Sequence, residues 1–494
     1  MITFSISIII LILGYIFYSK FVEKIFGADS NRTTPAYTMQ DDVDYLPMRT
    51  GKAYLIQFLD IAGLGPIFGA ILGAAYGPVA FIWIVVGAII GGAVHDYMSG
   101  MMSLRQNGES IAEVIGKWLG VSAKQFMRFF TLFLMILVGA AFIMGPSAIL
   151  SSKIQSILES ANVGEFWYFL TNKYFWVIII LAYYFVATLL PIDKIIGKIY
   201  PIFGFALLFM ALGIGVAQFF HGQNVPELTF ENIRNMKANA GDAPIFPLLF
   251  ITISCGAISG FHATQSPLMA RTIKNEKRGR EVFYGAMITE AVVAMIWAAA
   301  AMTFFGGVGE LNTELAAHEM QPAWFVNLIS NEWLGVFGGI LAVLGVIAAP
   351  ITTGDTALRS ARLIIADFTK IKQNKIKNRL IITIILFAVV YGFTLLKFDV
   401  LWRLMFWFNQ VLATFVFWGV AVYLAKKHKL YWISLIPAIF MTAVVTTYLF
   451  VAKEALHLDK TISYIIGISV TVIVTIIFFY FQIFKYRKAE PVED

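Results

Sequence analysis

Two apolar spans of this chain are broken at their centres: Leu55–Ala75 by Ile61-Ala62-Gly63-Leu64-Gly65-Pro66, and Ile245–Ser266 by Ser254-Cys255-Gly256-Ala257-Ile258-Ser259-Gly260. Glycine and proline weaken the hydrogen-bond ladder of a helix, and a continuous membrane helix needs neither. Inside a bilayer, the freed amide and carbonyl groups are tolerated only where they are buried in protein or face a water-filled cavity. Paired interrupted spans of this kind indicate the binding site of a membrane carrier.

The composition is that of a membrane protein. Hydrophobic residues make up 59% of the 494 residues, and charged residues make up 14%. Apolar runs of about 20 residues recur, which is the length that crosses a hydrocarbon core. We predict an all-α polytopic fold with about 13 transmembrane helices, at 2–19, 53–75, 78–102, 126–150, 174–191, 198–220, 244–267, 281–305, 332–352, 380–396, 399–425, 431–452 and 462–484.

Basic residues predict the orientation of these spans. With the N-terminus outside, 29 of the 37 Lys and Arg residues fall in cytoplasmic segments and seven fall outside. The positive-inside rule therefore places the N-terminus outside and the C-terminus in the cytoplasm. The same distribution accounts for the net charge of +7 without a nucleic-acid partner.

The two broken spans are the second and the seventh, so a repeat would contain five spans. Because five is odd, the second repeat must enter the membrane from the opposite side. We therefore predict an inverted 5+5 pair that resembles the LeuT-type architecture, with one helix before it and two after it. The predicted organisation is an N-terminal helix and cytoplasmic linker (1–52), a first repeat (53–220), a second repeat (244–425), and two C-terminal helices with a cytoplasmic tail (431–494).

Signals of catalysis are weak in this sequence. The one cysteine, Cys255, excludes an internal disulfide framework, and we expect it to be a small buried apolar residue. No CxxC, HExxH, Walker or GxGxxG pattern occurs in a credible context. The intramembrane His and acidic residues are too scattered for catalytic spacing, so we predict neither an enzyme nor a cofactor.

The backbone at the two breaks is the candidate substrate site. Half-helix ends carry unpaired amides and a positive dipole, which favour a carboxylate. His262 follows the second break, and its imidazole can donate to an anion. The alternatives are that the glycines only allow close helix packing and that His262 bonds a backbone carbonyl. The candidate residues are Gly63, Leu64, Gly65, Gly256, Ser259, Gly260, His262 and Gln265.

Acidic residues inside predicted spans are functional candidates, because burying a carboxylate in a membrane is costly. Asp60 precedes the first break, where it is predicted to bind Na⁺, exchange a proton, pair with His262 or His95, or cap the broken backbone. A possible proton relay is formed by His95, Asp96 and Glu290. For His95 and Asp96 the alternative is a structural network with Arg105.

Several stretches resemble the carbon starvation protein A (CstA) family of bacterial inner-membrane transporters. They are Gly27-Ala28-Asp29-Ser30-Asn31-Arg32-Thr33-Thr34-Pro35-Ala36, Asp41-Asp42-Val43-Asp44-Tyr45-Leu46-Pro47, Ile61-Ala62-Gly63-Leu64-Gly65-Pro66-Ile67, Gly92-Ala93-Val94-His95-Asp96-Tyr97, Arg105-Gln106-Asn107-Gly108-Glu109-Ser110, Cys255-Gly256-Ala257-Ile258-Ser259-Gly260-Phe261-His262-Ala263 and Thr352-Thr353-Gly354-Asp355-Thr356-Ala357. The likeness covers about residues 1–370. The chain departs from the family in being shorter than its longer members and in carrying an acidic residue at Asp60.

The resemblance implies a symporter of the bacterial inner membrane that takes up pyruvate or short peptides. It also implies a LeuT-like sodium site, with ligands from Ala62, Thr352 and Thr353 and with Asp355 nearby. Capping of the helix end, with Asp355 paired to Arg359, is the structural alternative. Sodium and proton coupling both remain open, as does the oligomeric state. A channel or a transporter-like nutrient sensor is the rival from another class.

Overall fold

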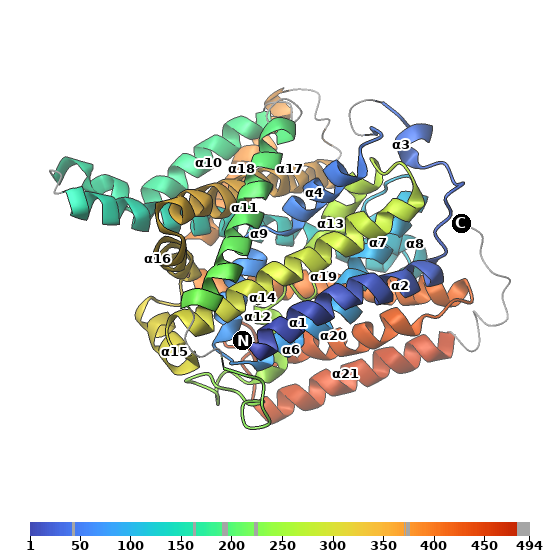
Figure 1. Ribbon diagram of the computed structural model, residues 1–494. Coiled ribbons are helices and arrows are strands. Elements are labelled where there is room, and N and C mark those ends of the chain that lie inside the picture. The colour runs from blue at the N-terminus through green and yellow to red at the C-terminus, as the bar shows by residue number, and fades with distance from the viewer. Residues whose placement is uncertain are drawn as a thin grey trace.

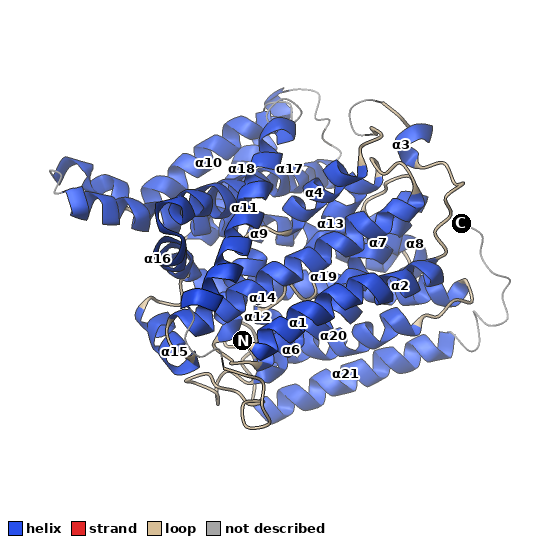
Figure 2. Cartoon of the chain, viewed as in Figure 1, coloured by secondary structure: helices blue, strands red, loops and turns tan. Residues whose placement is uncertain are grey.

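The computed structural model describes residues 1–41, 45–161, 165–189, 196–221, 226–369, 371 and 376–481. Every named element within these residues is a helix (Figure 2). Helix is the expected outcome for apolar spans, because each helical segment satisfies its own backbone groups without water. The prediction of an all-α polytopic protein is therefore confirmed. The quoted motif at 41–47 lies partly outside the described residues.

The described part of the chain contains ten helices that are long and apolar enough to cross a membrane, or eleven if the bent pair Thr50–Ile61 and Gly65–Ala74 is one span. The predicted spans 174–191 and 244–267 coincide with shorter helices, namely Lys173–Leu189 and the interrupted segment from Ile245 to Ala270. The count of 13 and the LeuT-type pairing of the repeats therefore remain predictions.

The first half of the chain contains α1 (Ile2–Leu13), α2 (Ser19–Phe26), α3 (Pro35–Thr38), α4 (Thr50–Ile61), α5 (Ala70–Ala74), α6 (Val79–Val86), α7 (Ala93–Arg105), α8 (Ile111–Leu119), α9 (Val121–Ala161), α10 (Lys173–Leu189) and α11 (Ile196–His221). The second half contains α12 (Phe250–Thr252), α13 (Gly260–Ala270), α14 (Ala286–Phe304), α15 (Val308–Ala317), α16 (Pro322–Ala342), α17 (Ala349–Thr369), α18 (Ile376–Thr394), α19 (Phe398–Lys426), α20 (Trp432–Val451) and α21 (Lys460–Phe481).

Wider π-helical turns lie next to several α-helices, and those at Gly14–Tyr18, Gly87–Gly92 and Val343–Ala348 join two α-helices into one span. The π-helical turns lie at Gly14–Tyr18, Gly65–Gly69, Gly87–Gly92, Ile245–Leu249, Arg280–Gly285 and Val343–Ala348. Shorter 3-10 turns lie at Glu165–Thr171 and Glu276–Arg278. As a result α1 and α2 form one span of 25 residues, and α6 and α7 form one of 27 residues.

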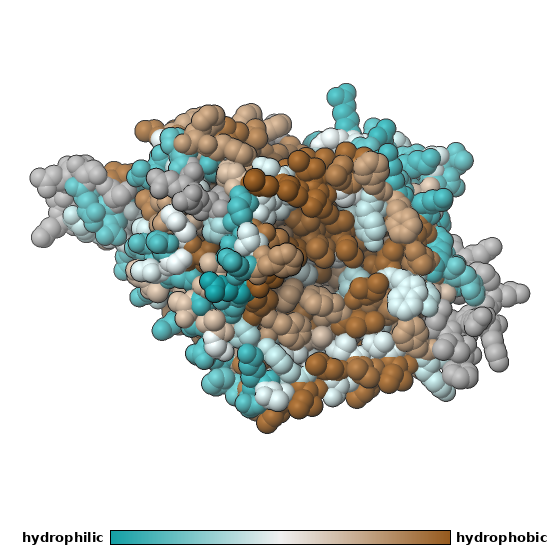
Figure 3. All heavy atoms as spheres, turned by 60° about the horizontal axis from the view of Figure 1, so that its bottom comes forward, coloured by the Kyte–Doolittle hydropathy of each residue, from teal (hydrophilic) through white to brown (hydrophobic). Residues whose placement is uncertain are grey.

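The helices form a bundle with α19 near its centre. In the most apolar 18-residue stretch of α19, 89% of the residues are buried inside the protein. In the corresponding stretch of α21, 22% are buried. Figure 1 shows α1 running beside α14, and α21 running beside α20 on the outside of the bundle. Apolar side chains cover the middle of the face in Figure 3, and hydrophilic ones gather toward its ends. This belt is the surface expected to meet lipid.

Loops that were predicted to lie on one side of the membrane contact one another. On the predicted outer side, Lys453 pairs with Asp242 at 2.9 Å, and Asn312 donates to the carbonyl of Ala75 at 3.0 Å. On the predicted cytoplasmic side, Arg105 donates to the carbonyl of Gly27 at 2.7 Å. This gathering supports the predicted division of the loops into two sets, and the direction in which they face the cell stays a prediction.

Candidate functional site

The first break begins where α4 ends at Ile61. Ala62 leaves the helical conformation with φ −85° and ψ 54°. The chain then turns by 54° into Gly65–Ala74. The proline at position 66 fits this place because the first turn of a helix does not need its missing N–H. The predicted interruption at Ala62, Gly63 and Leu64 is therefore present in the structure.

The second break separates α12 from α13. Ile253 leaves the helix with φ −99° and ψ 77°, and Ser259 is extended just before α13 starts at Gly260. Gly256 has φ +86°, a left-handed conformation that favours glycine. The unwound segment is buried, so its polar groups need partners from the protein.

Two side chains of α19 supply those partners. The amide of Asn409 donates to Ser254 Oγ at 2.8 Å and to Ser259 Oγ at 3.0 Å, and its carbonyl accepts from the backbone N–H of Phe261. Gln410 donates to the carbonyl of Ile258 at 3.0 Å. Sequence reasoning missed both residues. Their signal was a pair of neighbouring amides inside an otherwise apolar span.

The two breaks cross in direct contact. A Cβ atom placed on Gly65 would lie 2.3 Å from Cβ of Cys255, and one placed on Gly69 would lie 2.9 Å from the carbonyl oxygen of Thr252. No side chain fits at either position, because real Cβ atoms do not approach so closely. The packing interpretation of these glycines is therefore correct, and it is also what brings the two unwound segments together.

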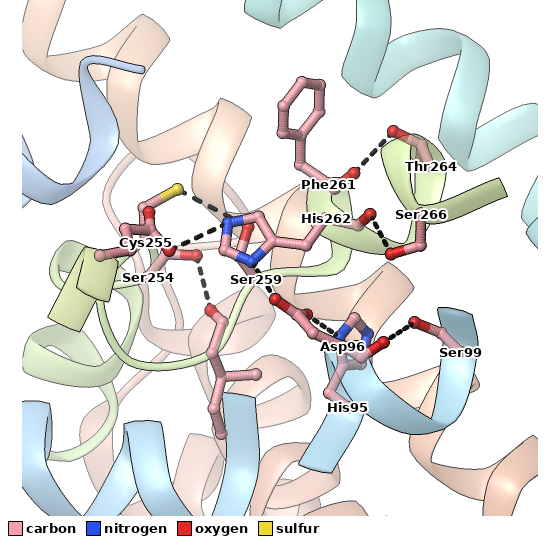
Figure 4. Close-up of polar contacts among 12 residues, drawn as sticks. His95, Asp96, Ser99, Ser254, Cys255, Ser259, Phe261, His262, Thr264 and Ser266 are labelled. Atoms are coloured by element: carbon pink, nitrogen blue, oxygen red, sulfur yellow. Dashed lines mark hydrogen bonds and ion pairs between the residues drawn. The ribbon is translucent and has the colours of Figure 1, made fainter. Parts of the chain in front are cut away.

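A chain of four buried ionisable side chains lies against the second break, and Figure 4 labels His95, Asp96 and His262 among them. His95 Nδ1 is 2.8 Å from Asp96 Oδ1, and His262 Nδ1 is 2.8 Å from Asp96 Oδ2. On its other side, His262 Nε2 lies 3.4 Å from Glu290 Oε2. The members come from α7, α13 and α14, so the structure joins the predicted relay residues to His262.

These contacts decide between earlier alternatives. Both histidines contact Asp96, and within the described residues Asp60 forms no ion pair with either of them, so the suggested pairing of Asp60 with His262 or His95 is not formed. The suggested network of His95 and Asp96 with Arg105 is also wrong, because Arg105 reaches Glu276 through two bonds of 3.0 Å. Arg105 lies at the C-terminal end of α7, more than two turns beyond Asp96, and this distance along the helix separates the two networks.

Cys255 is buried, as predicted, and it lies beside His262. Its Sγ is 3.6 Å from Ser259 Oγ. The donor atoms of Cys255, His262 and Glu290 all lie within 4.8 Å of one another, a grouping that could contact a single metal ion. Within the described residues, no hydrogen-bond partner is found for His262 Nε2 or for either carboxylate oxygen of Glu290. A proton shared between these two groups satisfies them without an ion.

A cavity of about 20 Å³ lies between the two breaks. Its lining includes Gly65, Phe142, Cys255, Phe406 and Asn409. This volume accommodates about one water molecule. The structure is thus closed around the candidate site, and a solute needs a different arrangement of the helices to enter.

The remaining predicted site residues lie near the first break or away from both. Gln265 is buried, and its amide donates to Thr264 at 2.8 Å rather than to either break. Asp60 is buried and forms no ion pair in the part of the chain that the structure describes. Such a carboxyl group is stable when it is protonated or holds a cation. Leu64 is also buried, and it packs against Gly145 of α9.

The predicted sodium ligands lie on two segments that pack against the same side chain, Phe142. A Cβ on Gly63 would lie 2.9 Å from Phe142, and one on Gly354 would lie 3.3 Å from it. Thr353 is buried, and the side chain of Thr352 lies outside the described residues. Asp355 pairs with Arg359 at 3.5 Å, as the structural alternative predicted. The sodium site at Ala62, Thr352 and Thr353 stays a prediction.

Two larger cavities open on the predicted outer side, with volumes of about 350 and 610 Å³. Four aromatic rings separate them from the small central cavity. Trp402 lies 5.5 Å from Phe68, 5.3 Å from Phe398 and 4.7 Å from Phe406, measured between ring centroids. Phe68 and Phe398 line the first outer cavity, Trp402 lines the second, and Phe406 lines the central one. We call these four residues the aromatic plug.

The fold and this site define a multi-pass membrane protein with two interrupted helices crossing at a buried polar cluster. The family model of the carbon starvation protein CstA matches residues 1–162 and 148–332. The chain therefore belongs to the carbon starvation protein CstA family, as its motifs indicated.

Relatives in several bacteria support this membership. The chain is 44% identical over 351 residues to an uncharacterised membrane protein of Haemophilus influenzae, which covers 64% of this chain and 95% of that protein. It is 30% identical over 350 residues to the peptide transporter CstA of Campylobacter jejuni, covering 59% of this chain and 48% of the transporter. It is 27% identical over 349 residues to the pyruvate/proton symporter BtsT of Escherichia coli, covering 59% of this chain and 47% of the symporter. The chain thus spans about half the length of these two transporters.

A solved structure shares the fold. The manganese transporter of Eremococcus coleocola, solved in complex with an aromatic bis-isothiourea compound, matches with a TM-score of 0.50 at 14% identity. The match covers 91% of this chain and 99% of the other. At this identity the likeness shows the fold alone.

Proposed function

We propose that this protein is a secondary active symporter that takes up a small carboxylate, pyruvate in the first place, together with a proton. Alternating access would expose the crossing of the two breaks first to one side of the membrane and then to the other. The observation that carries the proposal is the buried chain Glu290–His262–Asp96–His95 beside that crossing. A relative named as a pyruvate/proton symporter adds support.

The chemistry of His262 suits proton coupling. An imidazole can accept a proton at one ring nitrogen and release one from the other, and each nitrogen of His262 faces a carboxylate. Two buried carboxylates around one imidazole carry excess negative charge unless a further proton joins them. A negatively charged substrate would raise that cost, so substrate and proton favour each other's binding.

The substrate carboxylate would lie at the breaks, near Gly65 and the start of α13 at Gly260. The positive end of the α13 dipole favours an anion there. The backbone N–H of Phe261 is taken by Asn409, so the remaining amides and His262 would hold the substrate. The closed cavity requires the helices to separate before pyruvate can bind.

Sodium coupling and peptide uptake are the competing assignments. Sodium would require Ala62, Thr352 and Thr353 to converge on one ion, whereas the proton proposal uses contacts that are already formed. Peptide uptake is favoured by the named function of the Campylobacter relative. We further propose a location in the bacterial inner membrane with the N-terminus outside and the C-terminus in the cytoplasm.

Uptake of labelled pyruvate into proteoliposomes tests the proposal. We expect accumulation when an inward proton gradient is imposed, loss of accumulation with a protonophore, and no accumulation with a sodium gradient alone. Unlabelled short peptides in excess should not compete. The same vesicles are run with an empty-liposome control.

Each of the other possible results would overturn one named part of the proposed function. Accumulation driven by sodium would overturn proton coupling, and accumulation of peptides in place of pyruvate would overturn the substrate. Flux that equilibrates without ever concentrating pyruvate would indicate a channel. Binding of pyruvate without flux would indicate a sensor.

A further inference from the structure

The larger outer cavity, of about 610 Å³, reaches the second broken helix at Thr252, the last residue of α12. Its wall also contains Tyr76, Trp402 and Lys237, which lies in the segment between α11 and the turn at Ile245. The cavity therefore extends from the predicted outer surface to the aromatic plug. Only the aromatic plug would separate a solute in this cavity from the central site.

Most charges on this cavity are neutralised by a neighbour. Arg403 contacts Asp399 at 3.1 Å and Glu454 at 2.7 Å. On the rim, Lys453 pairs with Asp242 at 2.9 Å. These pairs leave little net charge, so they do not by themselves select an anion.

Lys237 is different. It is partly buried, and its ammonium lies 4.8 Å from the centre of the Tyr76 ring without an ion pair in the described residues. Tyr76 itself is fully buried, so its ring shields one side of the ammonium from water. A partly buried cation is a strong anchor for one carboxylate, because charge-assisted hydrogen bonds gain strength away from water.

We infer that this cavity is an outer capture site for a small monocarboxylate, with the Lys237 ammonium as its charge partner. The inference rests on the proposed function, since it names where the substrate of that carrier first binds. Lys460 also lines the cavity, but it is exposed, so Lys237 is the partly buried cation that one carboxylate would meet there.

The titration of Lys237 gives the site a pH dependence. Burial, followed by the nearby positive charge of Arg403, lowers the pKa of Lys237 to about 8, and Asp399 opposes this shift. The ammonium form is therefore present below pH 8 and is lost as the pH rises through that value. Other ionisable groups on the cavity are Tyr76, Asp242, Lys453, Glu454, His457 and Lys460.

Chemical protection tests the site without any need for transport. The purified full-length protein is acetylated with a limiting amine-reactive reagent at pH 8, and modification of Lys237 and Lys453 is followed by mass spectrometry. We expect pyruvate to slow the acetylation of Lys237 and not that of Lys453. Pyruvamide, which has a similar shape without the charge, should protect neither residue.

Kinetics of Lys237→Gln provide the second measurement, with Lys453→Gln as the matched control on the same cavity. Loss of a charge-assisted hydrogen bond should raise KM for pyruvate by about tenfold or more at pH 7, with kcat changed less than about twofold. For the parent protein KM should rise above pH 8, and for Lys237→Gln it should stay flat. Lys453→Gln should resemble the parent.

The outcomes separate this inference from the proposed function. Protection of Lys237 by pyruvate in a protein that shows no uptake would support the capture site and overturn the symporter. Uptake by the parent with no protection and an unchanged KM in Lys237→Gln would overturn the capture site and leave the symporter standing. Equal protection by pyruvamide would overturn recognition of the carboxylate.

Discussion

His262 Nδ1 lies 2.8 Å from Asp96 Oδ2, and this contact fastens the half-helix after the second break to α7. The two residues are 166 positions apart in the chain. Both side chains are fully buried, so the contact is made in the interior and not on a loop. A movement that separates α13 from α7 would therefore have to break this contact, and under the proposed function that step would depend on the protonation of His262.

Replacing His262 by Gln should abolish proton-driven uptake and leave a folded protein. Glutamine keeps a hydrogen-bond donor for Asp96 but cannot carry a proton between two carboxylates. Because positioned acid–base groups contribute about 10²–10⁴-fold to proton transfer, we expect at least about a 100-fold loss of concentrative uptake. His221→Gln, on an exposed residue at the end of α11, is the control. Unimpaired accumulation by His262→Gln would rule out this residue as the proton carrier.

Gly65→Ala should destabilise the protein. Its added methyl group would lie 2.3 Å from Cβ of Cys255, and the two broken segments would have to separate. Overpacking of this kind costs about 1–3 kcal/mol. The matched control is Gly392→Ala in α18, where nothing lies within 4 Å and alanine is the better helix former. Thermal unfolding in detergent should show a lower Tm for Gly65→Ala and an equal or higher Tm for Gly392→Ala.

The Arg105–Glu276 pair should contribute far more to stability than a surface pair. Glu276 is fully buried, receives two bonds from Arg105 at 3.0 Å, and accepts the backbone N–H of Asp29 at 2.8 Å. Removing one partner of a buried pair costs about 3–5 kcal/mol, so Arg105→Met should lower the Tm strongly.

The exposed pair Arg278–Glu281 serves as its control, since such pairs contribute about 0–1 kcal/mol. Arg278→Met should therefore leave the Tm almost unchanged. Similar losses for the two substitutions would contradict the assignment of the Arg105–Glu276 pair as a structural clamp on the predicted cytoplasmic side.

Trp402→Ala should open the aromatic plug. Trp402 contacts the other three rings, and its removal connects the outer cavities to the central one. Because Cys255 is the only cysteine and lines the central cavity, alkylation by a polar maleimide reports on that connection. We expect faster alkylation in Trp402→Ala than in the parent protein. Trp432→Ala, at an exposed position, should behave like the parent. Equal rates in all three proteins would refute a plug at Trp402.

The sequence predicted those parts of the site that depend on local pattern. Glycine and proline inside apolar spans reveal a broken helix directly, and the structure confirms both breaks at Ala62 and Gly256. Apolar run length likewise predicted the all-helical membrane fold. The family followed from short motifs, and the family model matches the same region.

What the sequence could not predict depends on packing between distant spans. Asn409 and Gln410 satisfy the second break from α19, and their sequence marks them only as two polar residues in an apolar span, without showing which segment they contact. Asp96 binds two histidines on different helices, whereas Arg105, the partner suggested by sequence proximity, binds Glu276 instead. The number of spans, the orientation and the coupling ion are still predictions, because they depend on the bilayer and on states other than this closed one.

The central cavity of about 20 Å³ has an energetic meaning for the cell. The cavity beneath the aromatic plug has space for about one water molecule. In this closed state the cavity therefore holds no chain of waters along which protons could cross the membrane. Under the proposed proton coupling, this closed state would conserve the proton gradient in the absence of substrate.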